Sequence, residues 1–148
     1  MKQNKFKSKK TITDTAINLA NGIGWSGGED LIINNGSGDD GASMSQLNQI
    51  QLGANTTGGL PGSLASVTVV DLEVDASHLN ELALITKGPL MLLNAIEIIG
   101  LASETALAIS NELIKMPKMI KATVLGPSAD AGDLMKINDF ILKNRIIN

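Results

Sequence analysis

The single histidine, His78, lies beside residues of the types that serve in hydrolase active sites. Ser77 is a candidate nucleophile, and Asp75 and Glu81 are carboxylates that could orient an imidazole. A general base must reach its nucleophile within hydrogen-bond distance and must itself be held by a third group. Ser77 and His78 are neighbours on an expected helix, and adjacent helix residues do not face each other. We therefore interpret His78 as a surface or cap-region histidine. No catalytic residue is predicted, and the chain is not expected to be an enzyme.

Other residue types limit the chemistry further. The absence of cysteine excludes disulfides and thiolate metal sites, and one histidine cannot supply a site that needs two imidazoles. A glycine-rich loop at 58–63 could cradle a phosphate, but a P-loop places a lysine after its last glycine. No Lys or Arg occurs between residues 11 and 86. We expect a turn at this loop, and we predict no metal and no cofactor.

A glycine-rich acidic segment at 35–43 has a pattern that suggests calcium. Its sequence, NGSGDDGAS, resembles one turn of the calcium-binding nonapeptide GGxGxDxUx of RTX β-rolls. Asn35 replaces the first glycine, Ala42 fills the large apolar position, and residues 27–31 are a truncated second copy. Calcium needs six to eight oxygens, which that family supplies from successive stacked turns. We interpret the segment as an acidic loop, and a calcium-dependent extracellular module is kept as an alternative.

Charge is strongly segregated along the chain. Residues 1–10 carry five lysines and no acid, residues 11–86 carry nine acids and no cation, and residues 87–148 carry seven basic and six acidic residues. We expect the basic arm to contact the acidic surface of a neighbouring copy. Contact with nucleic acid, which would be non-specific, or with an anionic membrane stays open. The predicted arm residues are Lys2, Lys5, Lys7, Lys9 and Lys10, and the predicted acidic partner residues are Asp30, Asp39, Asp40, Asp71 and Glu73.

The first 63 residues are expected to hold no shape of their own. The prediction for residues 1–20 is a basic arm followed by a short amphipathic helix, and no secretion signal is apparent. Residues 21–63 contain eleven of the fifteen glycines, mixed with Ser, Asn and Asp, which predicts an extended tether. Two apolar islands interrupt it, at 31–33 and 47–52, and either could add a strand to a sheet.

The remaining residues, 64–148, are expected to form a compact domain. Apolar residues make up 43% of the chain, but there are only two Phe, one Trp and no Tyr, so the core must be largely aliphatic. The expected order is a strand at 67–74, helices at 75–87, 90–101 and 103–116, a strand at 119–125 and a helix from 128 onward. The predicted fold class is α+β, mainly helical, with a small sheet completed by strands from the glycine-rich block or from a neighbouring copy. No repeat with a period of 20–50 residues is evident.

The run at 90–101 is the most apolar part of the chain. We predict an apolar helix in which Glu97 faces outward, pairs with Lys87 or Lys115, or lies in an interface. A span at 82–102 is long enough to cross a bilayer, but Lys87, Glu97 and the Gly88–Pro89 break oppose it. The helix residues singled out are Leu90, Leu92, Leu93, Ile96, Glu97 and Ile99.

These features predict a non-enzymatic structural subunit of a large homo- or hetero-oligomeric assembly, such as a phage or virus particle, a tail or a filament. Its partners would be other copies of the chain or other structural proteins, with no small-molecule substrate. The alternative is a membrane-associated protein that uses an apolar helical hairpin at 82–116, as an internal component of a lipid-containing particle or a small pore former. Localisation is left undefined, or the virion if the chain is viral.

Overall fold

The computed structural model describes residues 10–54 and 59–145. Within them, every paired strand runs parallel to its neighbours. The strands form three small sheets, here called sheets A, B and C. Sheet A consists of β1 (Thr11–Asp14), β2 (Asp30–Ile33) and β4 (Ser63–Leu64). Sheet B consists of β3 (Gly41–Ala42), β5 (Val67–Val69), β7 (Leu90–Met91) and β9 (Ile114–Lys115). Sheet C consists of β6 (Glu73–Asp75), β8 (Glu97–Leu101) and β10 (Lys121–Leu125).

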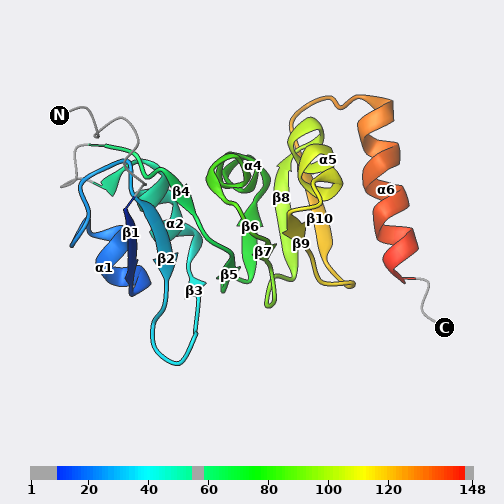
Figure 1. Cartoon of the computed structure of the whole chain (residues 1–148). Helices are drawn as coiled ribbons and strands as arrows, with labels where there is room; N and C mark the ends of the chain where they lie inside the picture. Colours follow the sequence, from blue (N-terminus) through cyan, green and yellow to red (C-terminus); the bar gives the residue numbers. More distant parts are fainter. Residues whose placement is uncertain (1–9, 55–58, 146–148) are drawn as a thin grey trace.

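The helices form a row beside these sheets (Figure 1). Within the described residues they are α1 (Ala16–Ala20), α2 (Met44–Gln51), α4 (Ala76–Ile85), α5 (Ala102–Ser110) and α6 (Ala131–Arg145). Each helix packs against the next one along the chain, from α1 through α6. Figure 1 shows the colours running in order from one end of the molecule to the other, so position in the sequence becomes position along its long axis.

The chain is therefore wound into coils that stack on one another. In sheet C, Glu73 pairs with Glu97 and Glu97 pairs with Lys121, so each coil here spans 24 residues. In sheet A, Thr11 pairs with Asp30 and Asp30 with Ser63, which gives coils of unequal length. The sequence showed no repeat because the period is regular only in the last coils, where equivalent inward positions carry different residues.

Stacking places one continuous aliphatic core inside the coils. Its fully buried side chains come from every part of the chain and include Leu19, Leu31, Leu47, Ile50, Leu64, Val67, Leu79, Leu82, Leu90 and Ile98. Near the N-terminal end Trp25 joins this core, and its indole N–H donates to the Leu19 carbonyl at 2.9 Å. The expected largely aliphatic core is thus present, with Trp25 as a buried member and Phe140 of α6 packed against it.

The described part of residues 21–63 differs from the extended tether that its composition predicts. It contains β2, β3, α2 and β4, and β2 lies between β1 and β4 in sheet A. The apolar island at 31–33 forms most of β2, in agreement with the expectation that an island could add a strand to a sheet. The island at 47–52 instead forms most of α2. The composition of residues 21–63 predicted the wrong conformation for two reasons. Many of the glycines lie in turns between regular elements, and the few apolar residues are buried against neighbouring coils, which an isolated segment would not have.

The apolar helix predicted at 90–101 is wrong. Leu90 belongs to β7, and Glu97 and Ile99 belong to β8, so the run forms two strands joined by a corner. Leu90 and Leu92 are buried there, whereas Leu93 and Ile96 are 64% and 60% exposed at the corner. Because these exposed positions are apolar, the run lacks the alternation of apolar and polar residues that indicates a strand. A short apolar run cannot be assigned to helix or strand by periodicity alone.

Other element predictions are confirmed in part. The helix expected after residue 75 is α4, and its N-cap is Asp75. The final strand and final helix are β10 and α6. The expected strand at 67–74 is divided between β5 and β6, which lie in different sheets. The mixed α and β class is therefore confirmed, but helices and parallel strands alternate along the chain instead of packing on one small sheet.

A helical hairpin at 82–116 is absent from this structure, because β7, β8 and β9 lie within or at the end of that range. Among the described residues, no helix has both the length and the apolar character needed to cross a bilayer.

Candidate functional site

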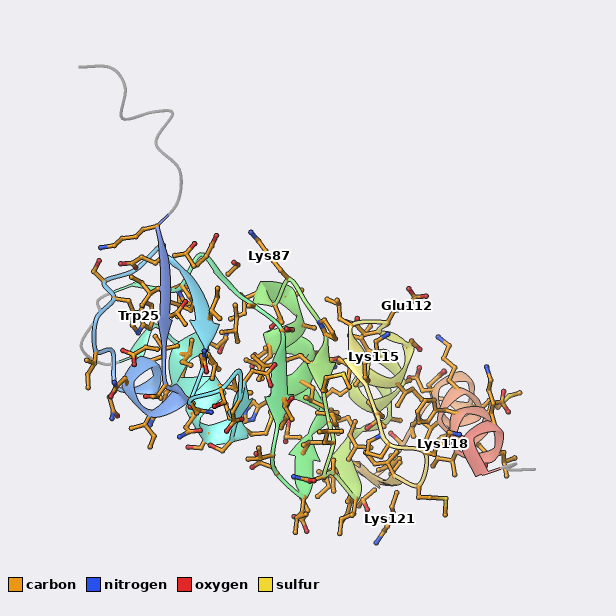
Figure 2. The ribbon with its side chains drawn as sticks, turned by 60° about the horizontal axis from the view of Figure 1, so that its bottom comes forward. Trp25, Lys87, Glu112, Lys115, Lys118 and Lys121 are labelled. Carbon is orange, nitrogen blue, oxygen red and sulfur yellow. The ribbon has the colours of Figure 1, made fainter. Side chains whose placement is uncertain are left out.

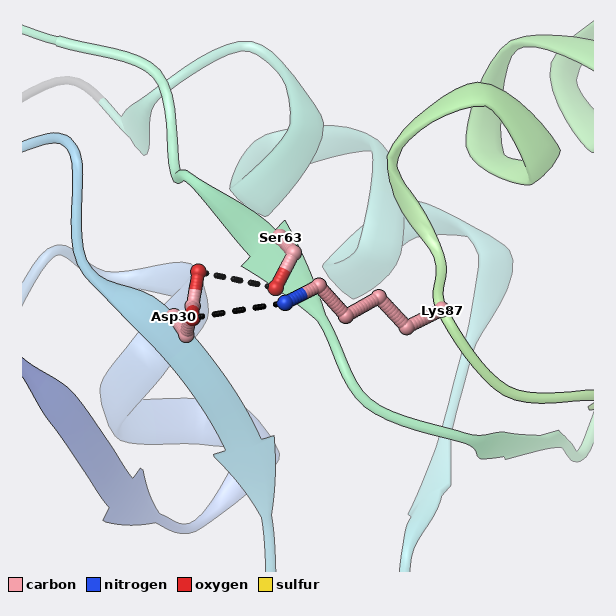
Figure 3. A network of polar contacts seen from close by, with 3 residues as sticks. All are labelled: Asp30, Ser63 and Lys87. Carbon is pink, nitrogen blue, oxygen red and sulfur yellow. Dashed lines mark hydrogen bonds and ion pairs between the residues drawn. The ribbon is translucent and has the colours of Figure 1, made fainter. Parts of the chain in front are cut away.

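A polar network joins three successive coils on the outer side of sheet A (Figure 3). The Ser63 hydroxyl donates to Asp30 Oδ1 at 2.8 Å, and Lys87 Nζ lies 3.6 Å from Asp30 Oδ2. Asp30 and Ser63 meet because β2 and β4 pair them in register, and Lys87 follows α4 in the next coil. These residues line a depression of about 390 Å³ together with Thr11 and Ser66.

The Asp30 carboxylate links the strands β2 and β4 to the segment that follows α4. Both carboxylate oxygens of Asp30 are already engaged, one by the buried Ser63 hydroxyl and one by an ammonium group that is 69% exposed. Gly62 is required beside it, because a Cβ at that position would lie 2.5 Å from the backbone carbonyl oxygen of Gly28 and 2.8 Å from Asp30 Oδ1. Asp30 was predicted as an acidic partner residue, Lys87 was considered only as a partner of Glu97, and Ser63 was not singled out. No sequence pattern could have predicted that Asp30, Ser63 and Lys87 lie close together, because their proximity depends on the lengths of the intervening coils.

Two of the other predicted acidic residues accept hydrogen bonds from backbone N–H groups. Asp71 accepts the N–H of Met44 at 2.7 Å, at the start of α2, and Asp39 accepts the N–H of Gly41 at 2.9 Å. Asp40 is half-buried and Glu73 is exposed. Of the arm, only Lys10 lies within the described residues, and it is exposed. Lys2, Lys5, Lys7 and Lys9 lie outside them.

His78 lies in the first turn of α4, next to the N-cap Asp75. Its backbone N–H and the Ser77 hydroxyl both bond to Asp75 Oδ1, at 3.1 and 2.8 Å. Burial raises the pKa of Asp75, but the hydrogen bond from Ser77 and the backbone N–H of His78 outweigh burial, so this pKa is lowered. The carboxylate caps α4 at its N-terminus, where negative charge is favourable.

The loop that resembles a calcium-binding turn uses its side-chain oxygens internally. Asn34 Oδ1 accepts the backbone N–H groups of Gly36 and Gly38, and Asn35 Oδ1 accepts that of Ala16. Across residues 10–54 and 59–145, no cluster of three or more His, Cys, Asp or Glu side chains is placed to hold a metal ion.

Glu29 stabilises the turn that precedes β2, near the N-terminal end of the coil stack. Its carboxylate accepts the backbone N–H groups of Ser26 and Gly27, the latter at 2.7 Å, and the Ser26 hydroxyl at 3.1 Å. Burial raises the pKa of Glu29, but these hydrogen bonds together outweigh burial, and the pKa lies below its ordinary value. The turn is thus held by a carboxylate that folding keeps ionised.

The C-terminal end of the coil stack carries a feature that sequence reasoning missed. β10 pairs with β8 on one side, and no other described strand pairs with its second side. The Lys121 N–H donates to the Ile96 carbonyl at 2.9 Å, so the backbone groups of Lys121 point toward β8. In a parallel strand, the N–H and C=O groups of successive residues point alternately to one side of the strand and to the other. Ala122 and Val124 therefore direct their backbone N–H and C=O groups away from β8, to an open edge.

The core is also less covered at this end. Ala122 and Val124 occupy the inward positions of β10 and are only half-buried. The residues paired with Ala122 in earlier coils, Ile98 and Val74, are 1% and 2% exposed. The last helix, α6, packs mainly on α5, and Ala122 and Val124 contact the small cluster that its Ile137 forms with Ala102 and Ala106 of α5. The terminal coil thus presents both unpaired backbone groups and partly exposed core.

Lysines line this end of the molecule. Lys115 in β9, Lys118 in the corner and Lys121 in β10 are all exposed, and Figure 2 shows them in sequence along the final coil, with Trp25 toward the opposite end. Lys121 Nζ lies 3.8 Å from Glu97 Oε2, and the Thr123 hydroxyl donates to the same carboxylate oxygen. One of the alternatives for Glu97 was an ion pair with Lys87 or Lys115. Glu97 does pair with a lysine, but that lysine is Lys121.

Stacked parallel coils that contact only their neighbours define the chain as a solenoid protein of mixed α and β content. No protein-family model matches the chain, and the searches of curated proteins and of solved structures found no match.

Proposed function

We propose that this chain is a non-enzymatic structural subunit that associates with other copies of itself in a larger assembly, such as a particle, a tail or a filament. The observation that carries the proposal is the open edge of β10. A solenoid buries its core by stacking coils, and its terminal coils need a polar cap or a partner to cover their edges. Here no described strand pairs with the outer edge of β10, although its inward side chains pack against α5 and Ile137 of α6.

The polar clusters support a structural role. The Asp30 carboxylate, the Glu29 carboxylate and the Asp75 carboxylate each bind groups of their own chain and thereby hold turns, caps or adjoining coils. An active site needs convergent groups that are free to meet a substrate. The depression beside Ser63 is instead lined by groups already bonded to one another.

The proposal is tested by sedimentation velocity on the full chain over a wide range of protein concentrations. We expect the weight-average sedimentation coefficient to rise with concentration, because an unpaired edge and exposed core are covered by association. Measurement at low and high salt separates the electrostatic part of the association, which salt screens. A chain that sediments as a monomer at every concentration in low salt would contradict the proposal.

A further inference from the structure

Exposed apolar side chains line the corner between sheets B and C in three successive coils. This corner is the turn between β5 and β6, between β7 and β8, and between β9 and β10. The turns stack directly, because the Ile96 N–H donates to the Leu72 carbonyl at 2.7 Å and the Lys121 N–H donates to the Ile96 carbonyl at 2.9 Å. The exposed residues, here called the corner ridge, are Val70 (44%), Leu72 (59%), Leu93 (64%), Ile96 (60%) and Met119 (62%).

The corner ridge has the character of an interaction surface. Single exposed apolar residues are ordinary on proteins, but a contiguous group of them is typical of a binding surface. Neighbouring strands of a sheet lie about 4.8 Å apart, so the five side chains form one stripe across adjacent coils. The core behind the stripe is already filled, because Ala95 and Ile120 at the same turns are 3% and 2% exposed. The ridge is therefore not part of the core and is exposed to a partner.

Charge changes sign along this stripe. The pairing of β5 with β7 and β9, and of β6 with β8 and β10, brings residues 67–75, 90–99 and 114–123 into register. The first segment contains three acids and no cation, the second contains only Glu97, and the third contains three lysines and no acid. The ion pair between Glu97 and Lys121 neutralises the middle coil. The ridge is thus acidic at one end and basic at the other, where Figure 2 shows the three lysines.

A second copy of the chain in antiparallel orientation matches this pattern. A two-fold axis through the middle coil places the acidic coil of each copy against the basic coil of the other, and Leu93 and Ile96 then face their own equivalents. Copies in parallel orientation would instead bring Glu73 against Glu73 and Lys118 against Lys118, and like charges across an interface are unfavourable. An anionic membrane would attract the lysines but repel the acids at the other end of the stripe.

We infer that two copies of the chain pair antiparallel through the corner ridge. This inference rests on the proposed function, in which copies associate, and it adds a contact that does not use the backbone edge of β10. The contact is isologous, so it closes at two copies. Burial of the apolar side chains supplies affinity, and the change of charge along the stripe selects the antiparallel orientation.

The apolar part of the contact is tested with Leu93→Gln, which changes an exposed side chain near the two-fold axis. We expect the Kd of self-association to rise at least about tenfold, because each copy then buries an amide in place of an apolar group. Sedimentation velocity on the full chain measures it. The matched control is Leu84→Gln, which makes the same change at an 86% exposed position of α4 and should leave association unchanged. Circular dichroism melts establish that both variants fold.

The orientation is tested by charge reversal. Glu73→Lys and Lys118→Glu change exposed residues at opposite ends of the stripe. Each variant alone should associate about tenfold more weakly in low salt, because it places like charges at both ends of the antiparallel contact. An equimolar mixture of the two variants should recover association, since each supplies the charge that the other lost. Glu81→Lys on α4 and Lys143→Glu on α6, alone and mixed, are the controls.

The outcomes separate this contact from the proposed function. Weaker association in Leu93→Gln and in both charge reversals, with recovery in the mixture, supports antiparallel pairing. Association that Leu93→Gln or the single charge reversals leave unchanged, or that the mixture does not recover, overturns the pairing and leaves the proposed function standing. A wild-type chain that stays monomeric at all concentrations overturns both.

Flotation with vesicles of equimolar phosphatidylcholine and phosphatidylserine tests the membrane as the occupant of the ridge. We expect no co-flotation that depends on Leu93, because the acidic end of the stripe opposes an anionic surface. Co-flotation of the wild type that Leu93→Gln abolishes would assign the ridge to lipid and overturn the pairing.

Discussion

At the scale of single residues, the chain relies on carboxylates that bind its own backbone. Glu29 holds the turn that leads into β2, and Asp75 caps α4. In both cases hydrogen bonds overcome the penalty of burial and lower the pKa of the carboxyl group. A residue whose pKa is lower in the folded state stabilises the fold above its unfolded pKa and loses that contribution as the pH falls toward its folded pKa.

Glu29→Gln tests this contribution. At pH 7 we expect the free energy of unfolding to fall by about 1 kcal/mol, because a neutral amide accepts the same N–H groups more weakly. The difference from the wild type should stay constant down to about pH 5 and shrink below about pH 4, as Glu29 becomes protonated. Urea titrations across this range measure it. A difference that persists unchanged at pH 2 would assign the effect to packing instead of charge.

Thr105 offers a prediction of opposite sign. Its side chain is fully buried in α5, and its hydroxyl has no hydrogen-bond partner in the structure. A buried hydroxyl without a partner is costly, and valine has nearly the same shape without that polar atom. We expect Thr105→Val to raise the free energy of unfolding by about 1 kcal/mol, measured by chemical denaturation. Thr105→Ser keeps the hydroxyl, removes a methyl group and should destabilise the fold.

At the scale of elements, neighbouring coils can stack only where backbones approach closely. Gly100 lies at an inward position of β8, and a Cβ there would meet the Cβ of Ala76 at 2.8 Å. That contact is between α4 and the strand of the following coil, so any larger residue must push the two apart.

Gly100→Ala should therefore lower the free energy of unfolding by roughly 1–3 kcal/mol, the usual cost of overpacking a core. Gly132→Ala is the matched control. Its Cβ would meet only the side chain of Asp130, and alanine is favoured over glycine within a helix such as α6. Thermal and urea unfolding of the two variants should differ in sign. Equal losses in both would show that the close approach of α4 and β8 is not the cause.

At the scale of the whole molecule, stability should decline toward the open end. In solenoids each coil is stabilised by its neighbours, and β8 has a partner strand on both sides, whereas β10 has one in the described chain. The backbone N–H groups of Ala122 and Val124 face the open edge.

Hydrogen exchange measures this gradient. In dilute solution we expect the amides of Ala122 and Val124 to exchange fastest within sheet C and those of β8 slowest. At concentrations where the chain associates, protection should appear at Ala122 and Val124 if the edge is covered. Slow exchange of these two amides in the dilute monomer would mean that the edge is already protected, and it would remove the basis of the proposed function.

The sequence alone determined several local features, because they depend on residues close together in the chain. Asp75 at the start of α4 and the order of β10 and α6 follow from caps, breakers and periodicity. The segregation of charge along the chain was also evident from the residues alone.

Only the tertiary structure decided the rest, for one physical reason. A glycine-rich block and an apolar run acquire their conformation from coils on either side, and the spacing of those coils is irregular before residue 67. Residues 21–54 can be buried because α2 and β2 have neighbours, and residues 90–101 are strands because parallel partners flank them. The Asp30–Ser63–Lys87 network and the open edge of β10 arise from that stacking, so no local pattern could have predicted them.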